Sequence, residues 1–230
     1  MKKILIVAML CMALVATMAP AAAAAATNYA QCMAAIQEQK TIQAQAHKTA
    51  TTLRKKGYKD SSAYVQAAKS TWNEVQAAKS TWNEAQAAIQ GYQKLAKYTD
   101  EDIRILTTTV FHEAGHTTEQ LRQYVAQVVL NRVKDSRFPS TVKSVITQPG
   151  QYATKYADAS TTQSVKSKDA ANGTYYYAMC ENAVKTAMMG QVNMPSNVLY
   201  QANFSQGKGV WKSVSFNSGW YSSTSYFCYG

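Results

Sequence analysis

The front part of this chain contains almost nothing that interrupts a helix. Between residues 28 and 97 there is no proline, and glycine occurs only at Gly57 and Gly91, in a stretch rich in Ala, Gln, Lys and Thr. This composition favours helix, and the KKGYKDSS segment around Gly57 supplies a stop followed by a polar restart. The sequence therefore predicts an arm over residues 27–98, built as two helices folded back into a hairpin.

A ten-residue repeat lies in the second half of this arm. The unit VQAAKSTWNE fills residues 65–74, recurs without change at 75–84, and is followed by an altered copy, AQAAIQGYQK. Ten residues advance a helix by about 1000°, which is about 80° short of three full turns. Trp72 and Trp82 therefore cannot share one face of a straight helix, and the repeat is either a lengthened spacer or a binding surface.

The first 26 residues have the pattern of a secretory signal peptide. Lys2 and Lys3 form a positive start, residues 4–15 an apolar core, and a run of alanines a cleavage zone. A membrane-spanning helix needs about 20 predominantly apolar residues, so an uncleaved anchor remains only as the alternative. We expect a secreted mature chain from about Thr27, with no stable membrane anchor.

The mature chain would hold an odd number of cysteines, so they cannot all form disulfides within it. Cys11 would leave with the signal peptide, and Cys32, Cys180 and Cys228 would remain. An odd number suggests one pair and one leftover thiol. Because Cys180 and Cys228 both lie in the back half of the chain, we expect them to form the disulfide.

The net charge of +11 points to an anionic partner or to solubility alone. Residues 27–98 hold ten Lys or Arg against four Asp or Glu, whereas residues 99–230 hold twelve against nine. Most of the positive excess therefore sits on the arm. Outside a cell the available polyanions are wall polymers and lipid headgroups, so nucleic acid is not an expected partner.

At Thr99 the sequence changes from the arm to a second domain. Thr99 and Asp102 have the spacing of a capping box, and an apolar run follows them. We expect a helix from here to about Ala114, with Gly115 as its stop.

The rest of the second domain mixes helices and strands. Thr117 offers the cap of a helix over residues 119–135, and a later helix should close at Gly190. Residues 197–204 and 223–230 are rich in aromatic and polar residues in strand-like runs. Helices first and short strands last predict an α+β domain over residues 99–230.

Residues 112–116 read HEAGH, a complete H-E-x-x-H motif. A zinc peptidase needs both histidines on one continuous helix, the glutamate beside them as a base, and a third ligand. Gly115 is expected to break the helix between His112 and His116, and the only other histidine, His47, belongs to the arm. We therefore predict neither a metal nor another cofactor, and a secreted zinc protease is the alternative. Its third ligand would come from Asp135, Asp158 or Glu181.

Four stretches resemble the SleB/CwlJ family of bacterial cell-wall hydrolases in content, order and spacing. They are ILTTTVFHEAG, VAQVVLNRVKDSRFPSTVKSVITQPGQY, NVLYQANFSQGKGVW and the terminal YFCYG, and the resemblance covers residues 100–230. The resemblance implies a lysozyme-like domain that cleaves peptidoglycan glycan strands, in spore cortex or vegetative wall. It places Glu113 at the position of the family's catalytic acid. The family's second glutamate is replaced by Thr117, so any supporting role is lost or moves to Glu119.

One glutamate can carry the chemistry that the resemblance implies. A carboxyl can protonate a glycosidic oxygen near neutral pH only if an apolar setting raises its pKa, and Val110, Phe111 and Ala114 could provide that setting. In the lytic transglycosylases that the family resembles, one glutamate then helps the 6-hydroxyl of the muramic sugar attack its own anomeric carbon. Both an anhydro product and hydrolysis by water stay open, as does a non-catalytic wall-binding protein that has kept the fold.

Further residues match positions where the family is polar or aromatic, and sugars bind to aromatic faces and amide groups. We expect Asn131 and Arg132 to have a structural role at a helix end, and the tyrosines at 175–177 to pack in the core. The candidate substrate-binding residues are Gln148, Gln151, Tyr152, Tyr200, Gln201 and Asn203.

Overall fold

The structure is a computed structural model that describes residues 33–34, 36–38, 40–44, 77, 80–81, 83–217 and 222–230. The chain divides into two compact units, Met1–Ala96 and Lys97–Gly230. In the first unit the described residues up to position 95 are helical, and Gln43 Nε2 donates to Gln86 Oε1 at 2.6 Å, which joins the two helical stretches. The signal peptide, the turn at Gly57, Cys32 and most of the repeat lie outside the described residues and stay predictions. Of the helices that are described, none is long and apolar enough to cross a membrane.

The helix α4, Asp100–Ala114, opens the second unit and carries Glu113. The Asp102 amide donates to the Thr99 hydroxyl at 3.1 Å, and the Thr99 amide donates to the Asp102 carboxylate at 3.0 Å, so the capping box is confirmed. The helix ends one residue before Gly115, as expected. A Cβ on Gly115 would lie 2.5 Å from the carbonyl oxygen of Phe111, so the chain needs glycine at this close approach.

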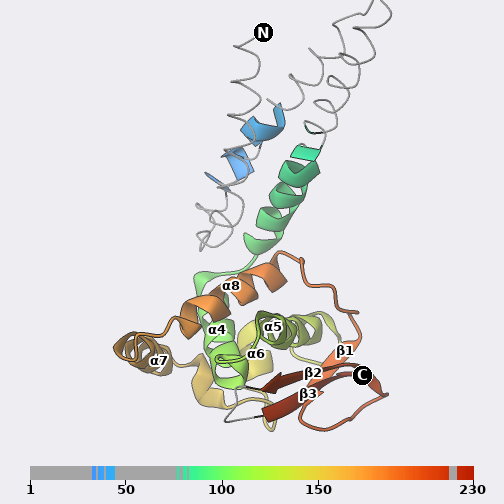
Figure 1. Ribbon diagram of the computed structural model, residues 1–230. Helices are drawn as coiled ribbons and strands as arrows, with labels where there is room; N and C mark the ends of the chain where they lie inside the picture. Colours follow the sequence, from blue (N-terminus) through green and yellow to red (C-terminus); the bar gives the residue numbers. More distant parts are fainter. Residues whose placement is uncertain are drawn as a thin grey trace, which may run out of the picture. The chain divides into compact units, whose positions relative to one another are not determined.

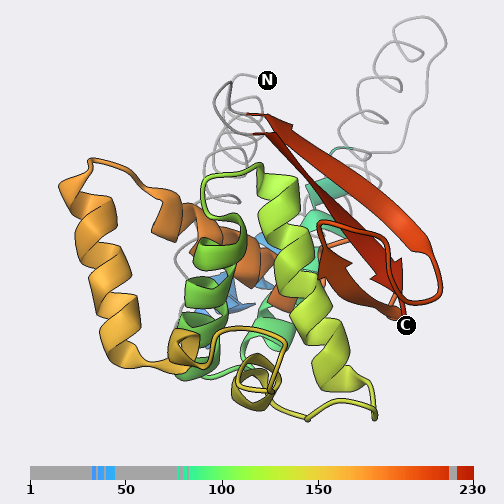
Figure 2. The same cartoon turned by 90° about the horizontal axis from the view of Figure 1, so that it is seen from below.

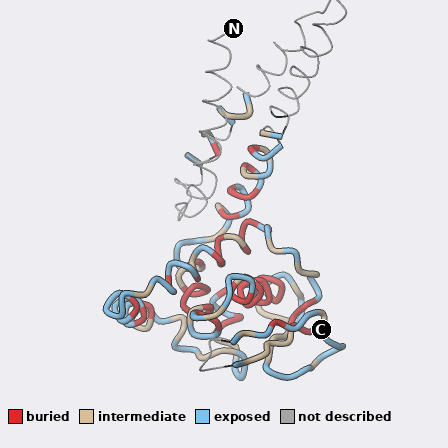
Figure 3. The backbone as a smooth tube through the Cα atoms, viewed as in Figure 1, coloured by how far each residue is buried: buried red, intermediate tan, exposed pale blue. Residues whose placement is uncertain are grey.

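The helix α5, Glu119–Lys134, runs beside α4 (Figure 2) and is buried along most of its length (Figure 3). The expected cap is wrong by one residue, because Thr118 rather than Thr117 accepts from the Leu121 amide. The hydroxyl of Thr117 instead donates to the carbonyl of Ala114 at 2.6 Å. Both α4 and α8 pack against α5, which makes it the centre of the domain core.

Four shorter elements complete the helical part: α6 (Val142–Ile146), the 3₁₀ helix η1 (Thr154–Ala157), α7 (Ala159–Ala171) and α8 (Tyr176–Met188). The sequence did not predict α7, because its apolar residues show almost no helical periodicity. In the structure only Thr162, Val165 and Asp169 of this helix are buried. Figure 2 shows α7 on one flank of α4 and the strands on the other flank of the helix pair.

The three strands are β1 (Val198–Ala202), β2 (Val210–Asn217) and β3 (Ser222–Tyr229). They form an antiparallel sheet in the order β1-β3-β2, so the last strand of the chain lies in the middle. The sheet follows the helices in sequence and lies beside them in space (Figure 1). The predicted α+β class, with helices first and strands last, is confirmed.

The expected disulfide between Cys180 and Cys228 is wrong, since both thiols are free and buried. Cys180 lies on α8, where burial raises its pKa to about 12. Cys228 lies on β3 opposite Tyr200. A disulfide requires two Cα atoms within a narrow range of distances, and membership of one domain does not supply that. A buried cysteine also serves as a small apolar core residue.

Candidate active site

Glu113 lies in the last turn of α4, where the buried helix reaches the surface. The residue as a whole is exposed, yet enough protein surrounds its carboxyl that burial raises the pKa of Glu113. Burial raises the pKa values of Tyr152 and Tyr156, and the negative charge of Glu113 raises both further, although the charge of Arg132 opposes the rise at Tyr152. These two tyrosines are therefore within electrostatic reach of the Glu113 carboxyl.

The turn that follows Glu113 is held in place by Arg122 of α5. Its Nη1 donates to the carbonyl of Gly115 at 3.1 Å and to the carbonyl of Thr117 at 2.7 Å. The amide of Gly115 closes the last turn of α4 by donating to Phe111 at 3.0 Å. Because these bonds fix the backbone on both sides of the helix end, the position of the carboxyl is set by the packing of α4 against α5.

The two histidines of the H-E-x-x-H motif face different aromatic neighbours. His112 stacks on Tyr156 with ring centroids 4.4 Å apart and planes 4° from parallel. Burial and the nearby charge of Lys155 lower the pKa of His112. His116 lies beyond the helix end and meets Phe216 edge-on at 6.1 Å. The predicted helix break between the histidines is confirmed, and no three His, Cys, Asp or Glu side chains of the described residues form a metal-binding group.

Asn131 and Arg132, near the end of α5, attach that helix to β1. Asn131 Nδ2 donates to the carbonyls of Pro195 and Val198, both at 2.9 Å. Arg132 Nε donates to the carbonyl of Leu199 at 2.6 Å. Both side chains are buried, so the structural role expected for this pair is confirmed.

Arg132 also contacts three of the candidate substrate-binding residues. Its Nη1 donates to Gln151 Oε1 at 2.7 Å, and its guanidinium carbon lies 5.6 Å and 5.8 Å from the ring centroids of Tyr152 and Tyr200. Since Tyr152 is within electrostatic reach of Glu113, one series of interactions connects the carboxyl with Gln151 and Tyr200. We call Glu113, Arg132, Gln151, Tyr152 and Tyr200 the carboxyl cluster.

The other three candidate residues do not join the carboxyl cluster. Gln148 has a buried amide oxygen for which the described residues supply no hydrogen-bond donor. Gln201 pairs with Phe227 between β1 and β3, and Asn203 is exposed just after β1. No described interaction links these side chains to Glu113.

Two parts of the site were missed or misread in the sequence. Tyr156 lies in a stretch that gives no helix signal, and its stacking on His112 follows from the packing of η1 against α4. The tyrosine run was expected to pack in the core, but Tyr175 is 73% exposed and Tyr176 is 36% exposed. Only Tyr177 is buried, because it alone faces the helix core once the first turn of α8 forms.

Comparison with known proteins identifies the second unit. Residues 117–223 match the family described as Cell Wall Hydrolase. The matched range begins after Glu113 and leaves out the arm. No curated protein and no solved structure matches the chain.

The match to this family supports hydrolase activity on the cell wall for the second unit. More narrowly, residues 117–223 mark it as a SleB/CwlJ-like cell-wall hydrolase domain, and peptidoglycan is the substrate class that this family supports.

Proposed function

We propose that this domain cleaves the glycan strand of peptidoglycan between muramic acid and N-acetylglucosamine, with Glu113 as the general acid and then the general base. The observation that carries the proposal is the burial that raises the pKa of the Glu113 carboxyl at the end of α4. A carboxyl that keeps its proton closer to neutral pH can give it to a leaving oxygen.

Two proton transfers by Glu113 account for the proposed reaction. First, the carboxyl protonates the glycosidic oxygen as the bond from the anomeric carbon breaks, and the bonding electron pair leaves with that oxygen. The Glu113 carboxylate then accepts the proton of the 6-hydroxyl of the same muramic sugar while that oxygen bonds to the anomeric carbon. A 1,6-anhydro end forms, Glu113 is protonated again, and no water is consumed.

A single carboxyl is sufficient for this sequence of steps. Ordinary glycosidases place a second carboxylate about 5–9.5 Å from the first, as a nucleophile or a base. The cause of the raised pKa of Glu113 is burial. In the carboxyl cluster, the rings of Tyr152 and Tyr200 and the amide of Gln151 are the groups suited to hold the sugars.

We also propose that the chain is exported and acts on the wall or on spore cortex. The support is the signal-peptide pattern of the first 26 residues and the net charge of +11. Sequencing the N-terminus of the protein recovered from outside producing cells should give a start near Thr27. A retained Met1 would contradict cleavage.

Digestion of purified sacculi tests the reaction. Mass spectrometry of the soluble products should show 1,6-anhydromuramic ends, which the Glu113→Gln variant should not release. Reducing muramic ends would mean that water replaces the 6-hydroxyl in the second step. Release of free peptides from uncut strands would contradict glycan cleavage.

A chelator separates this proposal from a zinc protease that uses the H-E-x-x-H motif. Activity on sacculi should persist in excess chelator, and the double variant His112→Gln/His116→Gln should keep substantial activity. Complete loss in chelator with recovery on adding zinc would instead establish the protease.

A further inference from the structure

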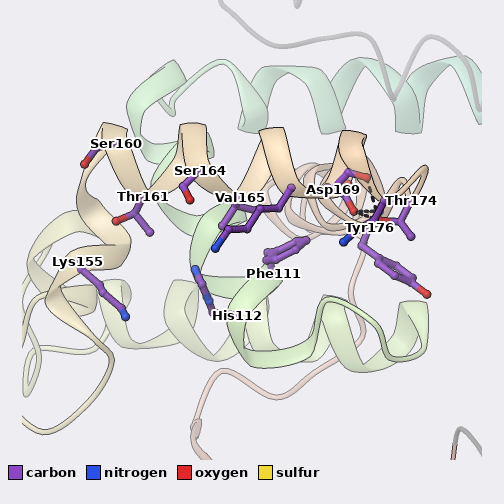
Figure 4. Close-up of a pocket in the computed structure, with 12 residues that line it drawn as sticks. Phe111, His112, Lys155, Ser160, Thr161, Ser164, Val165, Asp169, Thr174 and Tyr176 are labelled. Carbon is purple, nitrogen blue, oxygen red and sulfur yellow. Dashed lines mark hydrogen bonds between the residues drawn. The ribbon is translucent and has the colours of Figure 1, made fainter.

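A hollow of about 620 Å³ lies beside α4, between that helix and α7. Figure 4 shows Phe111 and His112 of α4 facing Ser164 and Val165 of α7, with Lys155 at one end. The volume falls in the range of about 300–1,000 Å³ that ligand sites commonly occupy. We call this hollow the α7 groove; its remaining lining residues are Ser160, Thr161, Lys168, Asp169, Asn172, Thr174 and Tyr176.

The α7 groove adjoins the proposed reacting centre without containing it. Glu113 does not line the groove, whereas His112, the residue before it, does. Successive helical residues differ by about 100° in direction and 1.5 Å in height. The carboxyl of Glu113 therefore points to a different side of α4 from Phe111, and His112 lies between the two directions.

The charged groups of the α7 groove favour an anionic ligand. Lys155 and Lys168 contribute two ammonium groups, and neither forms an ion pair with a carboxylate of the described residues. Burial and then the nearby charge of Lys155 lower the pKa of His112, so the Lys155 ammonium is within electrostatic reach of this wall of the groove.

The one acidic residue of the α7 groove is already engaged by protein groups. The Asp169 carboxylate accepts from the Thr174 hydroxyl and from the amides of Tyr176 and Tyr177, the latter two at 3.3 Å and 3.0 Å. These bonds join the end of α7 to the start of α8. The lysines are thus left as the charged groups available to a ligand.

The uncharged lining fits a peptide better than a phosphate polymer. Hydroxyls of Ser160, Thr161 and Ser164 and the amide of Asn172 can pair with peptide groups. Val165 and Phe111 offer apolar contact for short side chains. A polymer with a charge on every unit would be matched by a continuous row of cations, and this groove offers only two.

We propose that the α7 groove binds the acidic stem peptide of peptidoglycan, with stem carboxylates at Lys155 and Lys168. This inference rests on the proposed glycan cleavage. The stem is attached through the lactyl group at C3 of the muramic sugar, and Glu113 is proposed to break the bond at C1 of the same ring. The branch therefore leaves the strand from the same ring as the reacting bond, and the proposal places it along the wall formed by His112. It follows that strands carrying peptides should be preferred to bare strands.

Direct binding tests this site without requiring cleavage. A synthetic stem tetrapeptide with free carboxylates should bind the full-length Glu113→Gln protein in calorimetry, and added salt should weaken the binding. Lys155→Gln/Lys168→Gln should weaken it by about tenfold or more, because two charged hydrogen bonds are lost. The Lys155→Arg/Lys168→Arg pair should retain it. The control pair Lys134→Gln/Lys143→Gln removes two exposed charges outside the groove and should not change binding.

Three results of the binding experiment would overturn the inference. The first is no binding of the peptide, and the second is an equal loss of affinity in Lys155→Gln/Lys168→Gln, the groove pair, and in the control pair. The third is lysine-dependent binding of poly(glycerol phosphate) in place of the peptide.

Cleavage of matched substrates gives a second measurement. The ratio of kcat/KM for peptide-bearing strands to kcat/KM for amidase-treated bare strands should fall about tenfold in the groove pair. An unchanged ratio would overturn the inference while leaving glycan cleavage in place. A wild-type protein that binds the peptide but cuts neither strand would instead reject the proposed function and keep the binding site.

Discussion

Glu113 owes its chemical character to its position at the end of α4. The helix brings the carboxyl to the surface, while Tyr152 and Tyr156 lie close enough to respond to its charge. Burial favours the neutral carboxyl and raises its pKa. The same property that suits Glu113 to proton donation makes its ionised form unfavourable in the folded protein.

Replacing Glu113 by Gln should lower kcat on sacculi by a factor on the order of 10²–10⁴, as expected for a lost general acid and base. The same change should raise Tm at neutral pH. The folded-state pKa lies above the ordinary value of 4.5, so the stability that protonation gives is complete below that value. It is lost as pH rises through the folded pKa, whereas Gln is neutral throughout.

Thermal unfolding at acid and neutral pH checks this stability effect. The gain in Tm from Glu113→Gln should shrink as the pH falls below the ordinary glutamate pKa. Glu84→Gln, on an exposed arm residue that bonds Ser80, is the control and should show no gain at either pH. A variant that is less stable than the wild type at neutral pH would contradict the explanation by burial.

Tyr152 should influence the pH dependence of the reaction through Glu113. Tyr152→Ala admits water beside the carboxyl, so the pKa of Glu113 should fall toward its ordinary value. Because a general acid acts while protonated, the alkaline limb of the kcat profile should move to lower pH. Tyr152→Phe keeps the aromatic ring, so the alkaline limb of its kcat profile should stay near the wild-type position. Identical limbs for all three proteins would mean that Tyr152 does not shield Glu113.

At the scale of elements, the site depends on how α5 holds its neighbours. Arg122 fixes the turn between α4 and α5, and Arg132 fixes β1 and the loop that carries Gln151. Both arginines are buried and donate to backbone carbonyls from a helix that lies in the core. The helix, the loop and the strand that meet at the carboxyl cluster are thus positioned from one buried element.

Arg132→Lys should separate the effect of the positive charge of Arg132 from that of its hydrogen-bond geometry. Lysine keeps the positive charge but lacks the planar fork that reaches Leu199 and Gln151 together. A buried carbonyl left without its donor should lower the free energy of unfolding by about 1–3 kcal/mol, as measured in urea. Activity should also fall, since the loop with Gln151 and Tyr152 loosens.

The control for this substitution is Arg137→Lys. Arg137 is exposed and pairs with Asp135, and a surface exchange of this kind should change stability by less than about 0.5 kcal/mol. Equal effects of the two substitutions would show that Arg132 contributes only its charge.

At the scale of the whole molecule, most of the excess positive charge and the proposed catalytic residues belong to different units. The second unit, Lys97–Gly230, holds the helices, the sheet and the carboxyl cluster. Positive charge is concentrated in the arm, where ten Lys or Arg face four Asp or Glu over residues 27–98. A cationic arm would concentrate the protein on an anionic wall, whereas cleavage would depend on the second unit alone.

Sedimentation with sacculi measures the contribution of the arm. Binding should weaken as salt rises to about 0.5 M, where the screening length is only about 4 Å. Lys40→Gln/Lys94→Gln, on two exposed arm residues, should weaken binding at low salt more than Lys134→Gln/Lys143→Gln in the second unit. Equal losses would assign the attraction to net charge and not to the arm.

The sequence by itself determined those features that depend on neighbouring residues along the chain. The capping box at Thr99, the helix stop at Gly115 and the order of helices and strands follow from local propensity and spacing. The family resemblance selected Glu113 from the H-E-x-x-H motif, and its catalytic role stays a proposal.

Only the tertiary structure decided which distant side chains meet. It left Cys180 and Cys228 apart as free thiols, stacked Tyr156 on His112, and made Arg132 the link between Gln151 and Leu199. It also revealed α7, whose polar sequence gives no amphipathic signal, and with it the groove beside Glu113. The physical reason is that such contacts arise from the packing of whole elements, which local periodicity does not encode.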